Sequence, residues 1–147
     1  MGLIKVFLFE ITSVFSNRGA MSHISQLKIN IKNANKKALM KGLQLLGIEV
    51  IESNIAIDYY GRQQQVNDAL LAFKLEKYQF VLTKEGQVIG DFWQYHEDFI
   101  QNTIKTAMMV ASVPGVKKVN AKMQRSGWEV ELDVDDTVYN QQQALGW

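Results

Sequence analysis

The chain has 147 residues, of which 47% are hydrophobic and 21% charged, values typical of a single globular domain. Its 16 basic and 15 acidic residues leave a net charge of +1, too small to attract nucleic acid or an anionic membrane. Cysteine is absent, which excludes disulfides, thiolate nucleophiles and cysteine-ligated metals and is typical of a reducing compartment such as the cytoplasm.

Residues 1–20 allow two interpretations. Their apolar run, Leu3 to Phe15, is interrupted by Lys5 and Glu10 and is too short to span a bilayer. Its β-branched and aromatic residues are typical of an extra edge strand. Alternatively, these residues are a leader upstream of a start at Met21, and removing them then costs little stability.

A strand and a helix are predicted next. Apolar and polar residues alternate over residues 26–32, as in a half-buried strand. Asn33 or Asn35 can cap a helix over residues 36–46, and Gly47 can end it in the left-handed conformation. One face of this helix carries its leucines, Leu39, Leu43 and Leu46.

The middle of the chain predicts short strands and a hairpin. Residues 48–57 are strand-like but irregular, residues 58–62 break the pattern, and residues 69–75 alternate again. A three-residue loop, Lys84-Glu85-Gly86 with Gly86 left-handed, gives the best hairpin register. That register predicts the pairs Leu82–Val88, Val81–Ile89 and Tyr78–Phe92.

A second helix over residues 97–113 is ended by Pro114-Gly115, and a final hairpin follows. Around the loop 124–127, apolar residues face apolar ones, and each acidic residue faces a lysine or Asn. The apolar pairs are Met123–Trp128, Ala121–Val130 and Val119–Leu132. The polar pairs are Lys122–Glu129, Asn120–Glu131 and Lys118–Asp133.

The predicted order, β-α-β-β-β-β-α-β-β, indicates an α+β fold: an antiparallel sheet of about five to six strands with two helices packed on one face. We expect a single domain over residues 21–136 and a polar tail over residues 137–147.

Few residues suggest chemistry. The two histidines, His23 and His96, have no metal-ligand partner at a suitable spacing. No phosphate-binding glycine loop, nucleophile elbow or dinucleotide fingerprint is present. The sequence therefore predicts no metal and no cofactor, and an enzyme of unknown reaction type stays an alternative.

Aromatic and polar residues gather in the predicted loops: Tyr59, Tyr60, Arg62, Trp93 and Tyr95, with Asp91 nearby. Local packing explains each residue separately. Together they have the composition of the centre of a protein interface. The same rings could stack nucleobases, but the cations that nucleic acid requires are sparse.

Read from Met21-Ser22-His23, the chain resembles the hypothetical chloroplast reading-frame 35 proteins of plastids and cyanobacteria. The resemblance rests on this opening, on Tyr60-Gly61, Tyr78 and Gly90-Asp91-Phe92-Trp93, and on the segment from Gly115 to Val134. It favours the leader interpretation of residues 1–20. The chain departs from the family at Val66-Asn67-Asp68-Ala69 and in its polar tail.

The resemblance implies an accessory role, because members are often encoded near an AAA+ ATPase. We therefore expect a non-enzymatic adaptor that binds another protein, such as that ATPase, in the cytoplasm or plastid stroma. Tyr60, Arg62 and Trp93 are the expected centre of its binding patch, bordered by His23 and Asp91. No membrane partner is expected, and weak nucleic-acid binding is a further alternative.

Overall fold

The computed structural model of the chain describes residues 2–9, 24–28, 35–125 and 127–135. The following features of the sequence prediction lie outside these residues: residues 10–20, the opening Met21-Ser22-His23, the last part of the strand over 26–32, the cap candidate Asn33, and the tail from residue 137. The described elements are, in chain order, β1 (Gly2–Phe9), β2 (Ile24–Lys28), α1 (Lys36–Leu45), β3 (Glu49–Ile51), β4 (Ile55–Ile57), β5 (Gln63–Gln65), β6 (Ala69–Leu75), β7 (Tyr78–Thr83), β8 (Gln87–Asp91), α2 (Glu97–Ser112), β9 (Val116–Met123) and β10 (Gly127–Val134).

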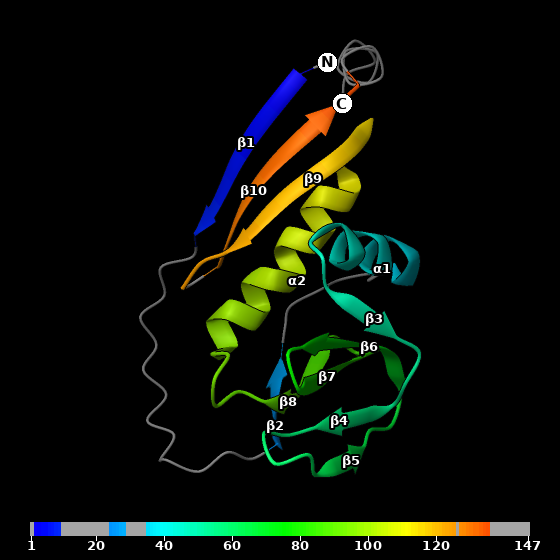
Figure 1. Cartoon of the computed structure of the whole chain (residues 1–147). Coiled ribbons are helices and arrows are strands. Elements are labelled where there is room, and N and C mark those ends of the chain that lie inside the picture. The colour runs from blue at the N-terminus through cyan, green and yellow to red at the C-terminus, as the bar shows by residue number, and fades with distance from the viewer. Residues whose placement is uncertain (1, 10–23, 29–34, 126, 136–147) are drawn as a thin grey trace.

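The α+β class, with antiparallel strands and two helices, is confirmed. The described strands form two sheets: a small three-stranded sheet of order β1-β10-β9 and a seven-stranded sheet that contains β2 to β8. Within the larger sheet β7 pairs with β4, β6 and β8, and the sheet curls (Figure 1). Both helices lie between the two sheets in Figure 1. The last hairpin, β9 and β10, thus belongs to a different described sheet from β8, which precedes α2 in the chain.

Strand β1 occupies one edge of the small sheet. It pairs antiparallel with β10 along its whole length, from Gly2 opposite Val134 to Phe9 opposite Gly127. Gly2–Phe9 therefore lies at one edge of the small sheet, with β10 as its partner.

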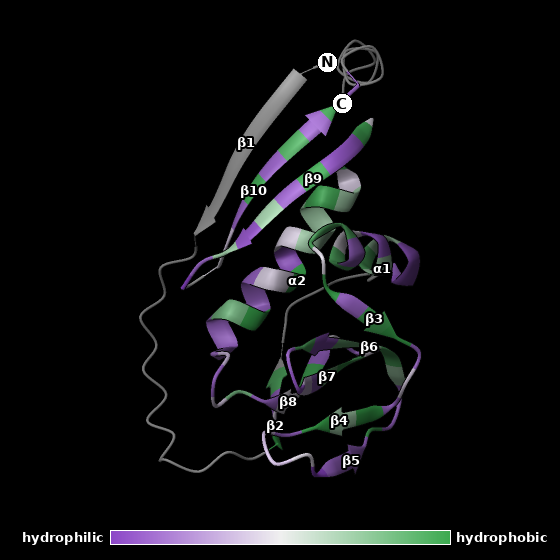
Figure 2. Ribbon diagram, in the orientation of Figure 1, coloured by the Kyte–Doolittle hydropathy of each residue, from purple (hydrophilic) through white to green (hydrophobic). Residues whose placement is uncertain are grey.

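The predicted register of the last hairpin is confirmed at all six pairs, from Trp128 opposite Met123 to Asp133 opposite Lys118. The ladder shifts register between Asp133 and Val134. Figure 2 shows the resulting alternation of polar and apolar residues along β9 and β10.

The central hairpin is confirmed at Val81–Ile89 and Leu82–Val88, and Gly86 is left-handed with φ +85°. The third predicted pair, Tyr78–Phe92, is not formed as a ladder pair: the β7–β8 ladder stops at Val81–Ile89, and β8 itself ends at Asp91. The irregular segment 48–57 contains two short strands, β3 and β4. The three glutamines at residues 63–65 form β5, a strand that the sequence did not indicate, and β5 pairs with β4.

The helices begin and end where the sequence predicts to within one residue. Asn35 caps α1, its side-chain oxygen accepting hydrogen bonds from the N–H groups of Lys37 at 2.9 Å and Ala38 at 3.3 Å. Gly47 follows the helix with φ +84°. The two helices touch at Gly42, where an added Cβ would collide with the carbonyl group of Ala107.

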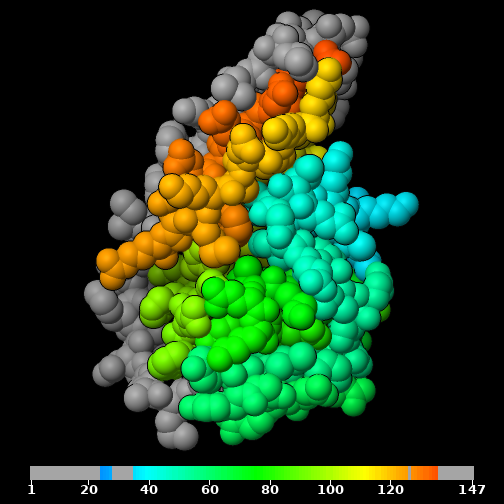
Figure 3. Space-filling model, in the orientation of Figure 1, coloured from blue at the N-terminus to red at the C-terminus, as the bar shows by residue number. Residues whose placement is uncertain are grey.

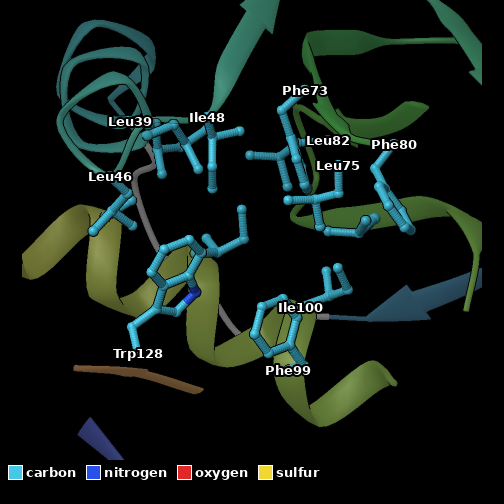
Figure 4. Close-up of a cluster of buried hydrophobic side chains, with 14 of the residues drawn as sticks. Leu39, Leu46, Ile48, Phe73, Leu75, Phe80, Leu82, Phe99, Ile100 and Trp128 are labelled. Atoms are coloured by element: carbon cyan, nitrogen blue, oxygen red, sulfur yellow. The ribbon is translucent and has the colours of Figure 1, made fainter. Parts of the chain in front are cut away.

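One main core joins both helices, the curled sheet and β10 (Figure 4). Trp128 contributes the largest side chain from the small sheet; it is 2% exposed and its indole N–H donates to the hydroxyl of Thr103 at 2.8 Å. A smaller cluster, Ala56, Val66, Ala72 and Val81, fills the curl of the larger sheet. Every residue of β7 is buried, because this strand lies between the two clusters.

Candidate functional site

The turn that follows β4 is built around the carboxylate of Asp58. This buried side chain accepts hydrogen bonds from the backbone N–H groups of Tyr60 at 2.9 Å and Arg62 at 2.8 Å. Its second oxygen accepts from Nε of Arg62 at 2.7 Å. Gly61 has φ +80°, a conformation that is unfavourable for other residues, and donates its N–H to the Asp58 carbonyl. The turn is therefore held by its own residues while the side chains of Tyr60 and Arg62 project outward.

Charge and hydrogen bonding keep Asp58 ionised. Burial raises the pKa of the Asp58 carboxyl, but the backbone N–H of Arg62, the Arg62 guanidinium and the backbone N–H of Tyr60 together outweigh burial. The net result is a pKa below the ordinary value of 3.8. The ion pair thus fixes the Arg62 side chain beside the turn.

Asp91, the last residue of β8, ties this turn to the segment that leads to α2. One oxygen of its carboxylate accepts from the N–H of Tyr59 at 2.9 Å and the other from the N–H of Trp93 at 3.0 Å. Asp91 is itself 1% exposed. A buried carboxylate with two backbone donors is satisfied without any outside partner, so its position indicates a structural role below the surface.

The rings above Asp91 form a continuous surface. The Tyr59 ring centroid lies 5.1 Å from that of Tyr60 and 5.6 Å from that of Trp93, both with edge-to-face geometry. The Lys77 ammonium sits 3.3 Å from the Tyr59 ring centroid, and Cζ of Arg62 sits 5.1 Å from that of Tyr60. We call this set, Tyr59, Tyr60, Arg62, Lys77 and Trp93, the aromatic patch.

The patch is continuous with the core beneath it. The ring centroids of Tyr59 and Tyr78 are 6.2 Å apart, and those of Tyr78 and Tyr95 are 5.6 Å apart. Contacts then continue through Phe99 to Trp128. Tyr78 donates its hydroxyl to Oε1 of Gln94 at 3.2 Å. Burial, followed by nearby negative charge, raises the pKa of both Tyr78 and Tyr95 to about 12.

Of the residues predicted from the sequence, Tyr60 and Trp93 lie against the Tyr59 ring, and Arg62 lies over the Tyr60 ring. Asp91 lies below them, not on the surface, and His23 is outside the described residues. Tyr95, which the sequence grouped with these loops, is buried in the core.

Sequence reasoning missed two residues. The first is Asp58, for which the spacing to Gly61, a common turn pattern, was an available signal. The second is Lys77, whose position over Tyr59 depends on contacts between separate strands and has no local signature.

Other chemistry is not apparent around the patch. Within the described ranges, no group of three or more His, Cys, Asp or Glu residues is placed to hold a metal ion. An open hollow of about 320 Å³ lies between β5 and the β7–β8 hairpin, lined by polar residues that include Gln64, Asp68 and Glu85, and none of the patch residues lines it. Of the described helices, none has the length and apolar character needed to cross a membrane.

Comparison of the chain with protein-family models, with curated proteins and with solved structures finds no match.

Proposed function

We propose that this protein is a small non-enzymatic accessory or adaptor protein that binds another protein through the aromatic patch. The observation that carries the proposal is the exposure of two large rings at the patch: Tyr60 is 67% exposed and Trp93 is 46% exposed. Aromatic and arginine side chains contribute most of the binding energy when an interface desolvates them.

Local packing accounts for only part of the patch. Tyr59 is partly buried and contacts both neighbouring rings as well as Tyr78, so the core requires it. Tyr60 and Trp93 keep about half or more of their surface in water, an arrangement that adds little to folding. A binding role gives these two side chains a function that packing does not.

The patch is also held in place before any partner arrives. Asp58 fixes the turn that carries Tyr60, and Asp91 fixes Tyr59 relative to Trp93. Ordering a surface in advance reduces the entropy lost on association, so more of the contact energy is retained as affinity. Such a site suits a partner that brings an apolar segment against the rings.

The positive charges beside the rings indicate which kind of partner segment would fit the patch. Arg62 and Lys77 are both cations, and each lies over the face of a tyrosine. A partner segment that combines an apolar residue with a neighbouring carboxylate complements this arrangement. The resemblance noted from the sequence makes an AAA+ ATPase the first such partner to test.

The experiment is affinity capture of partners from the native host by the full chain, with the captured proteins identified by mass spectrometry. Capture is repeated with Tyr60→Ala, Arg62→Ala and Trp93→Ala. We expect each change to weaken binding of the natural partner by more than about 1 kcal/mol, as for residues at an interface centre. Thermal unfolding of each variant checks the fold, above all for Arg62→Ala, which removes the ion pair with Asp58.

Glu85→Ala is the control. Glu85 is exposed but lies in the β7–β8 loop, outside the aromatic patch. A partner retained by all three patch variants, or lost only with Glu85→Ala, contradicts the proposal.

A further inference from the structure

The small sheet has a second surface suited to a partner, the outer edge of β9. The middle strand, β10, pairs with β1 on one side and β9 on the other. Among the strands that the structure describes, β9 pairs with β10 alone. It is eight residues long and runs across the face of the molecule shown in Figure 3 (yellow to orange). Edge strands of this length offer a row of backbone groups to an added strand.

The hairpin register tells which backbone groups face this edge. Gln124 donates its N–H to the carbonyl of Gly127 at 2.8 Å, which makes these two residues a hydrogen-bonded pair. Hydrogen-bonded pairs alternate along an antiparallel ladder, so Lys122, Asn120 and Lys118 bond to β10. The N–H and C=O groups of Val119, Ala121 and Met123 therefore point to the free edge.

Burial falls from β10 to β9 on the face that carries the apolar residues. Trp128, Val130 and Leu132 are all at most 2% exposed. Their partners in β9 are less well covered: Val119 and Ala121 are half-buried and Met123 is 47% exposed. An additional strand beside β9 would bury this remaining apolar surface.

The charges of β9 indicate which kind of strand can pair with its outer edge. β9 contains three lysines, Lys117, Lys118 and Lys122, and no acidic residue. On its paired side, Lys118 and Lys122 face Asp133 and Glu129 of β10. A second copy of β9, paired antiparallel about Asn120, would set lysine against lysine, an unfavourable arrangement. Lysines on an edge are a known protection against such self-pairing.

We propose that the free edge of β9 binds an extended segment of another protein in which acidic and apolar residues alternate, as a fourth strand of the small sheet. The carboxylates of that segment lie beside Lys118 and Lys122, and its apolar residues cover Val119 and Met123. β10 itself has this alternation and already pairs with the opposite edge of the same strand. The proposal concerns a different surface from the aromatic patch and does not depend on it.

The test uses a capped synthetic peptide with the β10 sequence, Gly-Trp-Glu-Val-Glu-Leu-Asp-Val, and amide hydrogen exchange of the full chain measured by NMR. In the protein alone, the amides of Val119, Ala121 and Met123 should exchange faster than those of Lys118, Asn120 and Lys122. Adding the peptide should slow exchange of the first three amides by about tenfold or more at saturation. A peptide with lysine at the three acidic positions should have no effect.

A double variant tests the charge requirement. Lys118→Gln combined with Lys122→Gln should weaken binding of the acidic peptide about tenfold and reduce its salt dependence. Lys84→Gln, in the β7–β8 loop, is the matched control and should change neither.

Three results would overturn the proposal: edge amides that are already protected in the full chain, an acidic peptide that protects none of them, or equal protection by the lysine peptide. The exchange experiment on the unaltered protein tests strand addition at β9 even if the double variant does not fold.

Discussion

Asp91 accepts a hydrogen bond from the backbone N–H of Tyr59, which lies 32 residues earlier in the chain, at 2.9 Å. Because its other oxygen binds the N–H of Trp93, this one buried side chain sets the spacing of two rings of the aromatic patch. The geometry of the surface therefore depends on a residue that no partner can touch.

Replacing Asp91 by Ala should cost roughly 1–3 kcal/mol for each backbone donor that stays buried without a partner. Partner binding should fall as well, because Tyr59 and Trp93 are no longer held together. Denaturant unfolding measures the first effect and affinity capture the second. Glu85→Ala, an exposed acidic residue in the β7–β8 loop, is the control. Unchanged stability of Asp91→Ala would show that these hydrogen bonds do not hold the site.

Replacing Trp128 by Ala should destabilise the protein by roughly 3–5 kcal/mol, because the change leaves a large cavity in the main core. Trp128 is 2% exposed, stacks on Phe99 and binds the Thr103 hydroxyl. Trp128→Phe keeps a ring there but loses the hydrogen bond, so its cost should be smaller. Measuring the free energy of unfolding of the unaltered protein, Trp128→Phe and Trp128→Ala should rank their stability in that order. A stability of Trp128→Ala close to that of the unaltered protein would contradict the observed packing.

Replacing Gly42 by Ala should lower stability although Ala is the better helix former by about 1 kcal/mol. A methyl group at this position has no room against the carbonyl of Ala107, and overpacking typically costs about 1–3 kcal/mol. Lys41→Ala changes the exposed neighbour in the same helix and should leave the melting temperature nearly unchanged. A rise in melting temperature for Gly42→Ala would show that the helices are not in close contact there.

Alkaline pH should unfold the protein through Tyr78 and Tyr95. Their folded pKa of about 12 lies above the ordinary value of 10.0, so the neutral phenols favour the folded state. This contribution is complete below pH 10.0 and is lost as the pH rises toward about 12. Ultraviolet absorbance titration should show late ionisation of two tyrosines, and Tyr78→Phe should reduce alkaline unfolding. Tyr60→Phe, at an exposed tyrosine, should not.

Removal of residues 1–20 should lower stability, because β10 would lose its ladder to β1. Proline variants separate this ladder from other effects. Backbone hydrogen bonds of β10 point alternately to β9 and to β1, and those of Val130 point to β1. Because Val6 lies opposite Val130, the N–H of Val6 bonds to β10, whereas the N–H of Lys5 does not.

Val6→Pro should therefore destabilise the protein more than Lys5→Pro. A loss above about 2 kcal/mol on truncation is the scale of a deleted core contact, and a smaller one would support the leader interpretation.

The local sequence pattern was sufficient to predict structure wherever the contacting residues are close together in the chain. The last hairpin could be predicted pair by pair, because Lys122 and Glu129, like Ala121 and Val130, face each other across a short loop. Asn35 and Gly47 likewise indicated the ends of α1 from local chemistry.

Contacts between distant segments could not be predicted in the same way. The division into two sheets depends on how α2 packs, and the pairing of β5 depends on β4 being available beside its glutamines. At the site, the sequence indicated which rings gather in loops. It could not indicate that Asp91 joins them from below, or that Lys77 covers Tyr59, because both follow from tertiary packing.

The complete burial of β7 has a consequence for how the molecule comes apart. This strand pairs with β4, β6 and β8 and contacts a core on each face, so it cannot open before its neighbours do. The described edge strands, such as β1 and β9 in the small sheet and β2 and β5 in the larger one, each pair with a single neighbour and can separate one at a time. Partial unfolding should therefore begin at such edge strands and reach β7, at the centre of the curled sheet, last.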